Sequence, residues 1–206
     1  MRTDRAILRW FAFATAVFVP VVVALMSPLL AWREPVYIVA GFAGVIAMVL
    51  LLAQPLLIGG DLPGLAARRG ARVHRVVGGA LVGAVIVHVA GLWITSPPDV
   101  IDALLFRSPT PFTPWGVIAM WAIFVAAVLA VFRRRLRPRT WRVGHMLVVA
   151  AGVTTSTVHA MLIEGTMGGI SKAVLCGLAV GATAKVMANR KPWRLLSRRS
   201  TANQKP

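Results

Sequence analysis

The sequence predicts an all-α integral membrane protein, a six-helix bundle with its N-terminus and C-terminus on the cytoplasmic side. Three observations lead to this prediction. Of the 206 residues 58% are hydrophobic, only 14% are charged, and the charges gather in short basic segments between long apolar runs. A soluble domain is closer to half apolar. A helix needs about 20 apolar residues to cross the hydrocarbon core of a bilayer.

Six apolar runs have the length of a membrane span, and Pro, Gly and charged residues separate them. The first run is longer than the apolar region of a usual signal peptide, so we expect it to be retained as a span. Residues 1–9 are expected to form a cytoplasmic N-terminus, 10–188 a six-span transmembrane domain, and 189–206 a basic cytoplasmic tail. The loop 96–113 is expected to be a connector or a segment on the membrane surface. The predicted spans are residues 10–32, 36–59, 73–95, 114–132, 143–163 and 169–188.

The distribution of Lys and Arg predicts the orientation. With the N-terminus inside, 20 of the 23 basic residues fall on the inner side, and only Arg33, Arg107 and Lys172 fall outside. Basic residues mark the cytoplasmic side of membrane proteins, so both termini are predicted to lie there. The same bias accounts for the net charge of +17, which would suggest a nucleic-acid partner in a soluble protein. We therefore expect a lipid bilayer, and no nucleic acid, as the environment of these charges.

All four histidines lie in the third and fifth predicted spans. Fourteen residues separate His74 from His88, and the same number separates His145 from His159. Fourteen residues at about 100° each return to within roughly 40° of the start and rise about 21 Å, so each pair shares one helix face at two depths. The two spans run in the same direction because one span lies between them. His74 can then lie level with His145, and His88 level with His159.

Two imidazoles at each of two levels suit the binding of two b-type haems. The inner haem would be held by His74 and His145, and the outer haem by His88 and His159. Zinc requires four ligands around one point, which the 21 Å rise prevents. The single cysteine, Cys176, excludes c-type haem attachment and cysteine-ligated zinc or iron–sulfur sites. A six-span transporter or proton channel that uses the histidines as a relay is the alternative from another class.

Basic and aromatic residues accompany the inner pair of histidines. Arg75 and Arg142, with Arg72, are candidate partners for the anionic propionates of the inner haem. The general excess of positive charge on the inner side is the other explanation for these arginines. Trp141 lies one turn before His145, where it can pack on the haem edge or belong to the aromatic belt at the membrane interface.

These residues resemble the ferric reductase-like transmembrane domain family. The resemblance covers about residues 36–188, and the histidine pattern is its specific part. It implies a six-span bundle with two stacked b-type haems, ligated by the four histidines. The motifs that carry it are Arg72-Val-His74-Arg75 with Gly78 and His88 after it, and Trp141-Arg142-Val-Gly-His145 with His159-Ala-Met-Leu and Gly165 after it.

The resemblance also implies a function. We expect a dihaem b-type cytochrome in the bacterial inner (plasma) membrane, a stand-alone member that relays electrons as the haem subunit of an oxidoreductase system. Many members of the family continue into a flavin- and nicotinamide-binding domain, but this sequence has no glycine-rich dinucleotide fingerprint. We therefore expect no flavin or NAD site on this chain, and a separate electron donor, either a flavin reductase or a quinol. The acceptor would be a protein or a metal. A ferric or other metal reductase acting at the outer face remains the nearest alternative.

Overall fold

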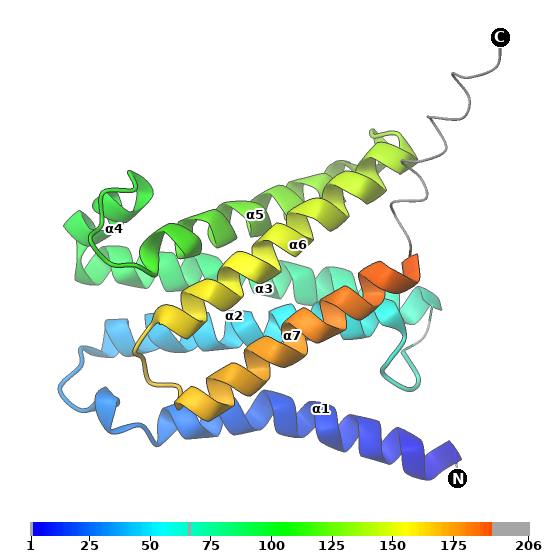
Figure 1. Ribbon diagram of the computed structural model, residues 1–206, viewed down its shortest axis with the longest axis horizontal. Coiled ribbons are helices and arrows are strands. Elements are labelled where there is room, and N and C mark those ends of the chain that lie inside the picture. Colours follow the sequence, from blue (N-terminus) through cyan, green and yellow to red (C-terminus); the bar gives the residue numbers. More distant parts are fainter. Residues whose placement is uncertain (1, 66, 191–206) are drawn as a thin grey trace.

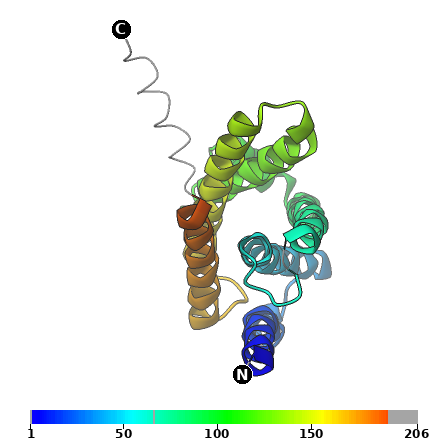
Figure 2. The same cartoon turned by 90° about the vertical axis from the view of Figure 1, so that its right-hand side faces the viewer.

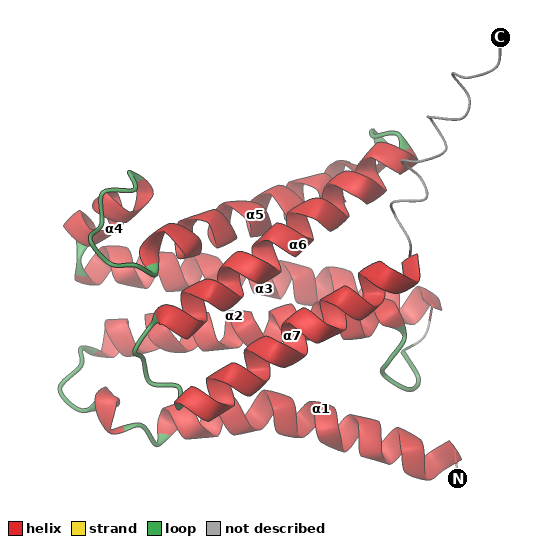
Figure 3. Cartoon of the chain, viewed as in Figure 1, coloured by secondary structure: helices red, strands yellow, loops and turns green. Residues whose placement is uncertain are grey.

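The computed structural model describes residues 2–65 and 67–190, and this part of the chain consists of helices and loops without strands. Figure 1 shows its arrangement, and Figure 3 shows how short the loops are. The predicted tail lies outside the described residues from residue 191 onward. The elements are α1 (Arg2–Leu25), η1 (Pro28–Leu30), α2 (Pro35–Gly59), α3 (Ala67–Thr95), α4 (Pro97–Leu104), α5 (Thr113–Val131), η2 (Phe132–Arg134), α6 (Pro138–Leu162) and α7 (Gly169–Arg190).

Six helices of the described chain are long and apolar enough to cross a membrane, namely α1, α2, α3, α5, α6 and α7. Large apolar side chains cover much of their outer surface, as at Ile170, Val131 and Val76, which are 85%, 75% and 70% exposed. Such a surface is unfavourable in water and favourable against lipid chains. The chain is therefore a multi-pass membrane protein, and the predicted all-α bundle of six spans is confirmed.

The first helix differs from the predicted range of 10–32, because α1 extends from Arg2 to Leu25. Pro28 explains the early end, since the residue before a proline is disfavoured in the α conformation. The hydroxyl of Ser27 accepts a hydrogen bond from the Leu29 amide at 3.3 Å and begins η1 instead. The predicted connector 96–113 contains the short helix α4, where the Ser96 hydroxyl donates to Asp99 at 2.6 Å.

The long helices alternate in direction, so α1 begins and α7 ends at the same end of the bundle (Figure 1). We call this the basic end, since it also carries the α2–α3 loop and the arginine-rich α5–α6 turn, and we call the opposite end the far end. Helix α2 packs on α3, α7 and α1, while α5 pairs with α6, and α6 also contacts α7. Seen from the end in Figure 2, α1 (blue) lies at one edge and the α5–α6 pair (green) at the opposite edge.

Candidate functional site

Helices α3 and α6 carry all four histidines and run in the same direction through the bundle (Figure 1). In each helix the first histidine lies toward the basic end and the second toward the far end. An apolar layer occupies the positions between them, so each helix places its histidines on either side of a shared core. This layer contains Leu81 and Val85 of α3, Val149 and Val153 of α6, Leu51 of α2, and Met120, Ile123 and Phe124 of α5.

The two histidines toward the far end are held by backbone carbonyls of other helices. The Nδ1 atom of His88 lies 2.7 Å from the Ala40 carbonyl oxygen on α2. The Nδ1 atom of His159 lies 2.9 Å from the Phe112 carbonyl oxygen, just before α5. A carbonyl only accepts hydrogen bonds, so each neutral imidazole carries its proton on Nδ1 and has a free lone pair on Nε2.

Two glycines leave space for these imidazole rings, because they have no side chain. A Cβ atom added at Gly116 of α5 would lie 2.6 Å from Cε1 and Nδ1 of His159, and one added at Gly44 of α2 would lie 3.1 Å from Nδ1 of His88. Each ring therefore rests against helix backbone that has no side chain. The Phe112 ring adds an edge contact to His159, with centroids 5.9 Å apart. This end of the site is sterically well defined.

The histidine of α6 at the basic end is held differently. The His145 ring stacks on Trp141, with ring centroids 5.7 Å apart and an interplanar angle of 19°. The backbone of Ala126 on α5 approaches the His145 imidazole, but Nδ1 of His145 is buried without a hydrogen bond of normal geometry. The Trp141 indole nitrogen is likewise buried without a partner. Stacking on Trp141 orients this ring.

Gln54 of α2 contacts the other histidine of the basic end, His74. The Nδ1 atom of His74 lies 3.3 Å from the Gln54 carbonyl oxygen, and the Gln54 side chain also reaches α3. With its nitrogen turned toward α3, the amide donates to His74 Nδ1 at 2.5 Å and to the His74 carbonyl at 3.3 Å, and its oxygen accepts from the Gly78 amide at 2.9 Å. The opposite orientation lets a protonated Nδ1 donate to the amide oxygen, but it sets the amide nitrogen against the Gly78 N–H and the amide oxygen against the His74 carbonyl. The first orientation therefore satisfies more groups in this structure, and in it Nδ1 of His74 is the acceptor.

Sequence reasoning did not select Gln54, although one signal marks it. It is the only amide side chain in the apolar run 36–59, and a polar side chain inside a membrane span is a functional candidate by default. Its partner on α3 was not predictable from spacing, since the contact joins residues 20 positions apart on two helices.

Helices α3 and α6 do not pack closely against each other in the described chain. Each of them packs on other helices. Helix α3 packs mainly on α2, whereas α6 packs on α5 and α7. Within the described residues, no three of His, Cys, Asp and Glu gather around one point. The described chain therefore presents two imidazoles toward each end of the bundle, from helices that are set apart. This fits a flat macrocycle with one ligand on each face.

The remaining candidate residues lie at the ends of the bundle. Arg75 of α3 and Arg142 of α6 are exposed, on the same end as His74 and His145. At the far end, the Lys172 ammonium donates to the Ile163 carbonyl at 2.6 Å and so closes the end of α6.

The six long apolar helices define a multi-pass membrane protein. Residues 38–156 match the family model described as ferric reductase like transmembrane component. This is more than half of the chain, and the chain belongs to that family. The match includes His74, His88 and His145 and ends three residues before His159. Neither the comparison with curated proteins nor that with solved structures found a match.

Family membership gives the coarse function. The family is known for binding haem in its membrane domain. Membership therefore indicates a membrane protein with a redox or electron-transfer role. The described residues fit such a cofactor on their own chemistry, since two imidazoles toward the far end present free Nε2 atoms from separate helices.

Proposed function

We propose that the chain is a dihaem b-type cytochrome that relays electrons across the bacterial inner membrane as the haem subunit of an oxidoreductase system. One observation carries the proposal: His88 and His159 each bind a backbone carbonyl through Nδ1, at 2.7 and 2.9 Å, and so keep Nε2 free. A haem with two axial imidazoles supplies reversible one-electron transfer at its iron. We assign one haem to His74 and His145 at the basic end, and one to His88 and His159 at the far end.

The protein's own groups would orient these ligands and keep water out. The carbonyls of Ala40 and Phe112 fix the tautomer and the ring plane of the imidazoles that they bind. The apolar layer around Leu81 and Val85 separates the two levels with side chains that cannot take part in acid–base chemistry. Arg75 and Arg142 would balance the propionates of the haem at the basic end.

The direction of transfer follows from the orientation that the basic residues predict. With the basic end in the cytoplasm, electrons would enter at the haem of His74 and His145 and leave from the haem of His88 and His159. The donor would be a separate flavin reductase or a quinol. The acceptor would be a protein or a metal ion on the outer side.

A ferric or other metal reductase acting at the outer face is the second candidate. The description of the matched family model favours it. Steady-state assays with ferric chelates distinguish the two candidates: a metal reductase turns over many equivalents of chelate, whereas a relay subunit without its acceptor protein is oxidised slowly.

Haem content tests the proposal. Purified protein should bind two haems per chain, measured as the pyridine haemochrome, with a Soret band that sharpens when dithionite is added. His88→Ala should lose the far-end haem and keep the other, and His74→Ala should do the reverse, as resolved by the two low-spin signals in electron paramagnetic resonance. Val87→Ala, at the neighbouring exposed position, is the matched control and should keep both haems.

Two outcomes would contradict the proposal. A well-folded protein without haem, made with an ample haem supply, would favour a transporter or channel with a histidine relay. A loss of both haems in each histidine variant would indicate a single site or misfolding.

A further inference from the structure

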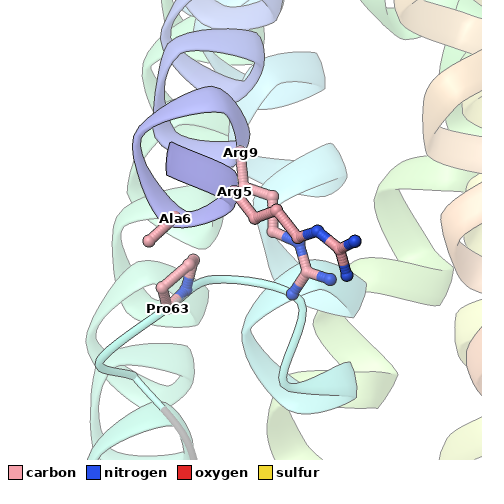
Figure 4. A pocket seen from close by; sticks show the side chains of 4 residues that line it. All are labelled: Arg5, Ala6, Arg9 and Pro63. Carbon is pink, nitrogen blue, oxygen red and sulfur yellow. The ribbon is translucent and has the colours of Figure 1, made fainter. Parts of the chain in front are cut away.

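A small basic cavity lies at the start of α1. It has a volume of about 240 Å³ and is lined by Arg5, Ala6 and Arg9 of α1 and by Pro63 of the α2–α3 loop. Figure 4 shows the side chains of Arg5 and Arg9 extending to the same side of α1, over the loop. Like charges four residues apart on a helix repel each other, and no carboxylate lines the cavity. The cavity therefore favours an anion.

The acidic residue of the adjoining loop is engaged elsewhere. Asp61 forms an ion pair with Lys185 of α7, which ties the α2–α3 loop to the end of that helix. The charges of Arg5 and Arg9 are therefore not balanced by Asp61.

A larger apolar groove follows the same helix toward the far end. It has a volume of about 730 Å³ and lies between α1 and α7, with Ala12, Ala16 and Val23 on one wall and Ile170, Val174 and Leu178 on the other. The three residues of α7 are 85%, 55% and 44% exposed. The groove is thus open along the lipid-facing side of the bundle, and its volume is in the range of ordinary ligand pockets.

The basic cavity and the groove lie on one face of α1. Arg5, Arg9, Ala12, Ala16 and Val23 follow one another at intervals of four, three, four and seven residues, which is the spacing of a single helix face. From Arg9 to Val23 the helix rises about 21 Å. This exceeds half of the roughly 30 Å hydrocarbon core. An acyl chain that starts from a headgroup at Arg5 and Arg9 can therefore lie along the groove.

We propose that α1 binds an anionic glycerophospholipid. Arg5 and Arg9 hold its phosphate against Pro63, and one acyl chain lies in the groove between α1 and α7. Guanidinium groups suit phosphate because they present paired N–H donors, and basic pockets at the ends of membrane helices recognise lipid headgroups. A free phosphate ion would use only the basic cavity. The apolar groove further along the same face of α1 favours the lipid.

Native mass spectrometry of the full chain in detergent tests this site. Palmitoyl-oleoyl phosphatidylglycerol should bind about tenfold more tightly than the matching phosphatidylcholine, and millimolar inorganic phosphate should not displace it. Arg5→Gln combined with Arg9→Gln should remove this preference. Arg133→Gln combined with Arg134→Gln is the matched control, because these exposed arginines lie at the same end in η2 and the charge change is equal.

A substitution in the groove tests the acyl-chain part of the proposed site separately. Ala16→Phe fills the groove and keeps both arginines, so it should weaken the binding of both lipids, while the preference for phosphatidylglycerol remains. This variant also serves if the double arginine variant does not accumulate.

Several results would overturn the proposal. Equal binding of the two lipids, equal losses in the two double arginine variants, or displacement by inorganic phosphate would each do so. Haem content is measured in the same samples and is expected to be unchanged, so this site and the proposed electron-transfer function succeed or fail separately.

Discussion

A histidine inside a membrane has two ring nitrogens that need partners. The four histidines of this chain differ in what contacts Nδ1. His88 and His159 use Nδ1 for a backbone carbonyl of another helix. His74 meets the Gln54 carbonyl at the longer distance of 3.3 Å together with the Gln54 side chain. His145 stacks on Trp141 instead. Since the partner of Nδ1 fixes which nitrogen can bind a metal, the far-end pair is the better organised of the two pairs for the proposed haem ligation.

The mixed contacts of His74 lead to a prediction at Gln54. Gln54→Leu removes the amide but keeps an apolar side chain, so His74 loses its contact with the amide and keeps its contact with the backbone carbonyl of the same residue. Loss of a hydrogen-bond partner of a metal ligand typically costs 10–100-fold in affinity. We expect the basic-end haem to be lost about tenfold faster during dialysis against apomyoglobin, while the far-end haem is retained.

Met48→Leu, a volume-conserving change on the same helix, is the control for this variant and should release both haems at the wild-type rates. Equal retention of both haems in Gln54→Leu would show that the amide does not position His74.

The histidines show which features of single residues the sequence predicts and which it does not. The spacing of fourteen residues predicted that His74 and His88 share a face of α3, because helix geometry is local and regular. The same spacing did not predict that Gln54, Ala40 and Phe112 contact the histidines. Those contacts depend on which helices become neighbours, and no periodicity within one segment records that.

At the scale of elements, α5 carries no histidine and still shapes the site. Its first residues follow Phe112, whose carbonyl binds His159, and Gly116 lies under the imidazole. Helix α2 acts in the same way on α3, through Ala40, Gly44 and Gln54. The helices without histidines therefore orient the histidines of their neighbours.

Gly116→Ala tests this role of α5. The new Cβ atom would lie 2.6 Å from the His159 ring, and the bond to Phe112 limits how far that ring can move. We expect loss of the far-end haem, measured as a fall from two haems to one per chain and disappearance of one electron paramagnetic resonance signal.

The control is Gly83→Ala on α3, where a Cβ atom meets nothing within 4 Å. Both changes gain the same helix propensity of about 1 kcal/mol, so that term cancels. Two haems in Gly116→Ala would show that the ring adapts and that α5 does not restrict it.

For the whole molecule, the alternation of six spans places the arginine-rich segments at one end. The ion pair of Asp61 with Lys185 joins the α2–α3 loop to α7 at that end. Because Lys185 is 56% exposed, we expect this pair to contribute no more than about 1 kcal/mol. Apolar packing such as that of Leu52 on Leu175 contributes more to the association of α2 with α7.

The orientation of the whole chain is tested by labelling in intact bacterial cells. Trp32→Cys, at a fully exposed far-end position, should react with a membrane-impermeant maleimide. Arg135→Cys, in the turn before α6 at the basic end, should react only after the cells are permeabilised. These expectations follow from the excess of basic residues on the cytoplasmic side.

The wild-type chain is the control, because its Cys176 is only 3% exposed and should remain unlabelled in both conditions. The reverse labelling pattern would place the basic end outside and would reverse the proposed direction of electron transfer.

The sequence by itself determined the class of fold and the faces that carry histidine. Apolar length, charge clustering and the fourteen-residue spacing are properties of single segments. In a bilayer they predict, in that order, a membrane span, an orientation and a shared helix face. It misplaced the first span because apolar composition continues past Pro28, whereas the helix does not.

Only the tertiary structure decided what holds each imidazole. The contacts from His88 to Ala40 and from His159 to Phe112 join residues 48 and 47 positions apart. The separation of α3 from α6 likewise results from how α2, α5 and α7 pack around them. Such contacts depend on how several helices pack together. No single segment of the sequence specifies that packing.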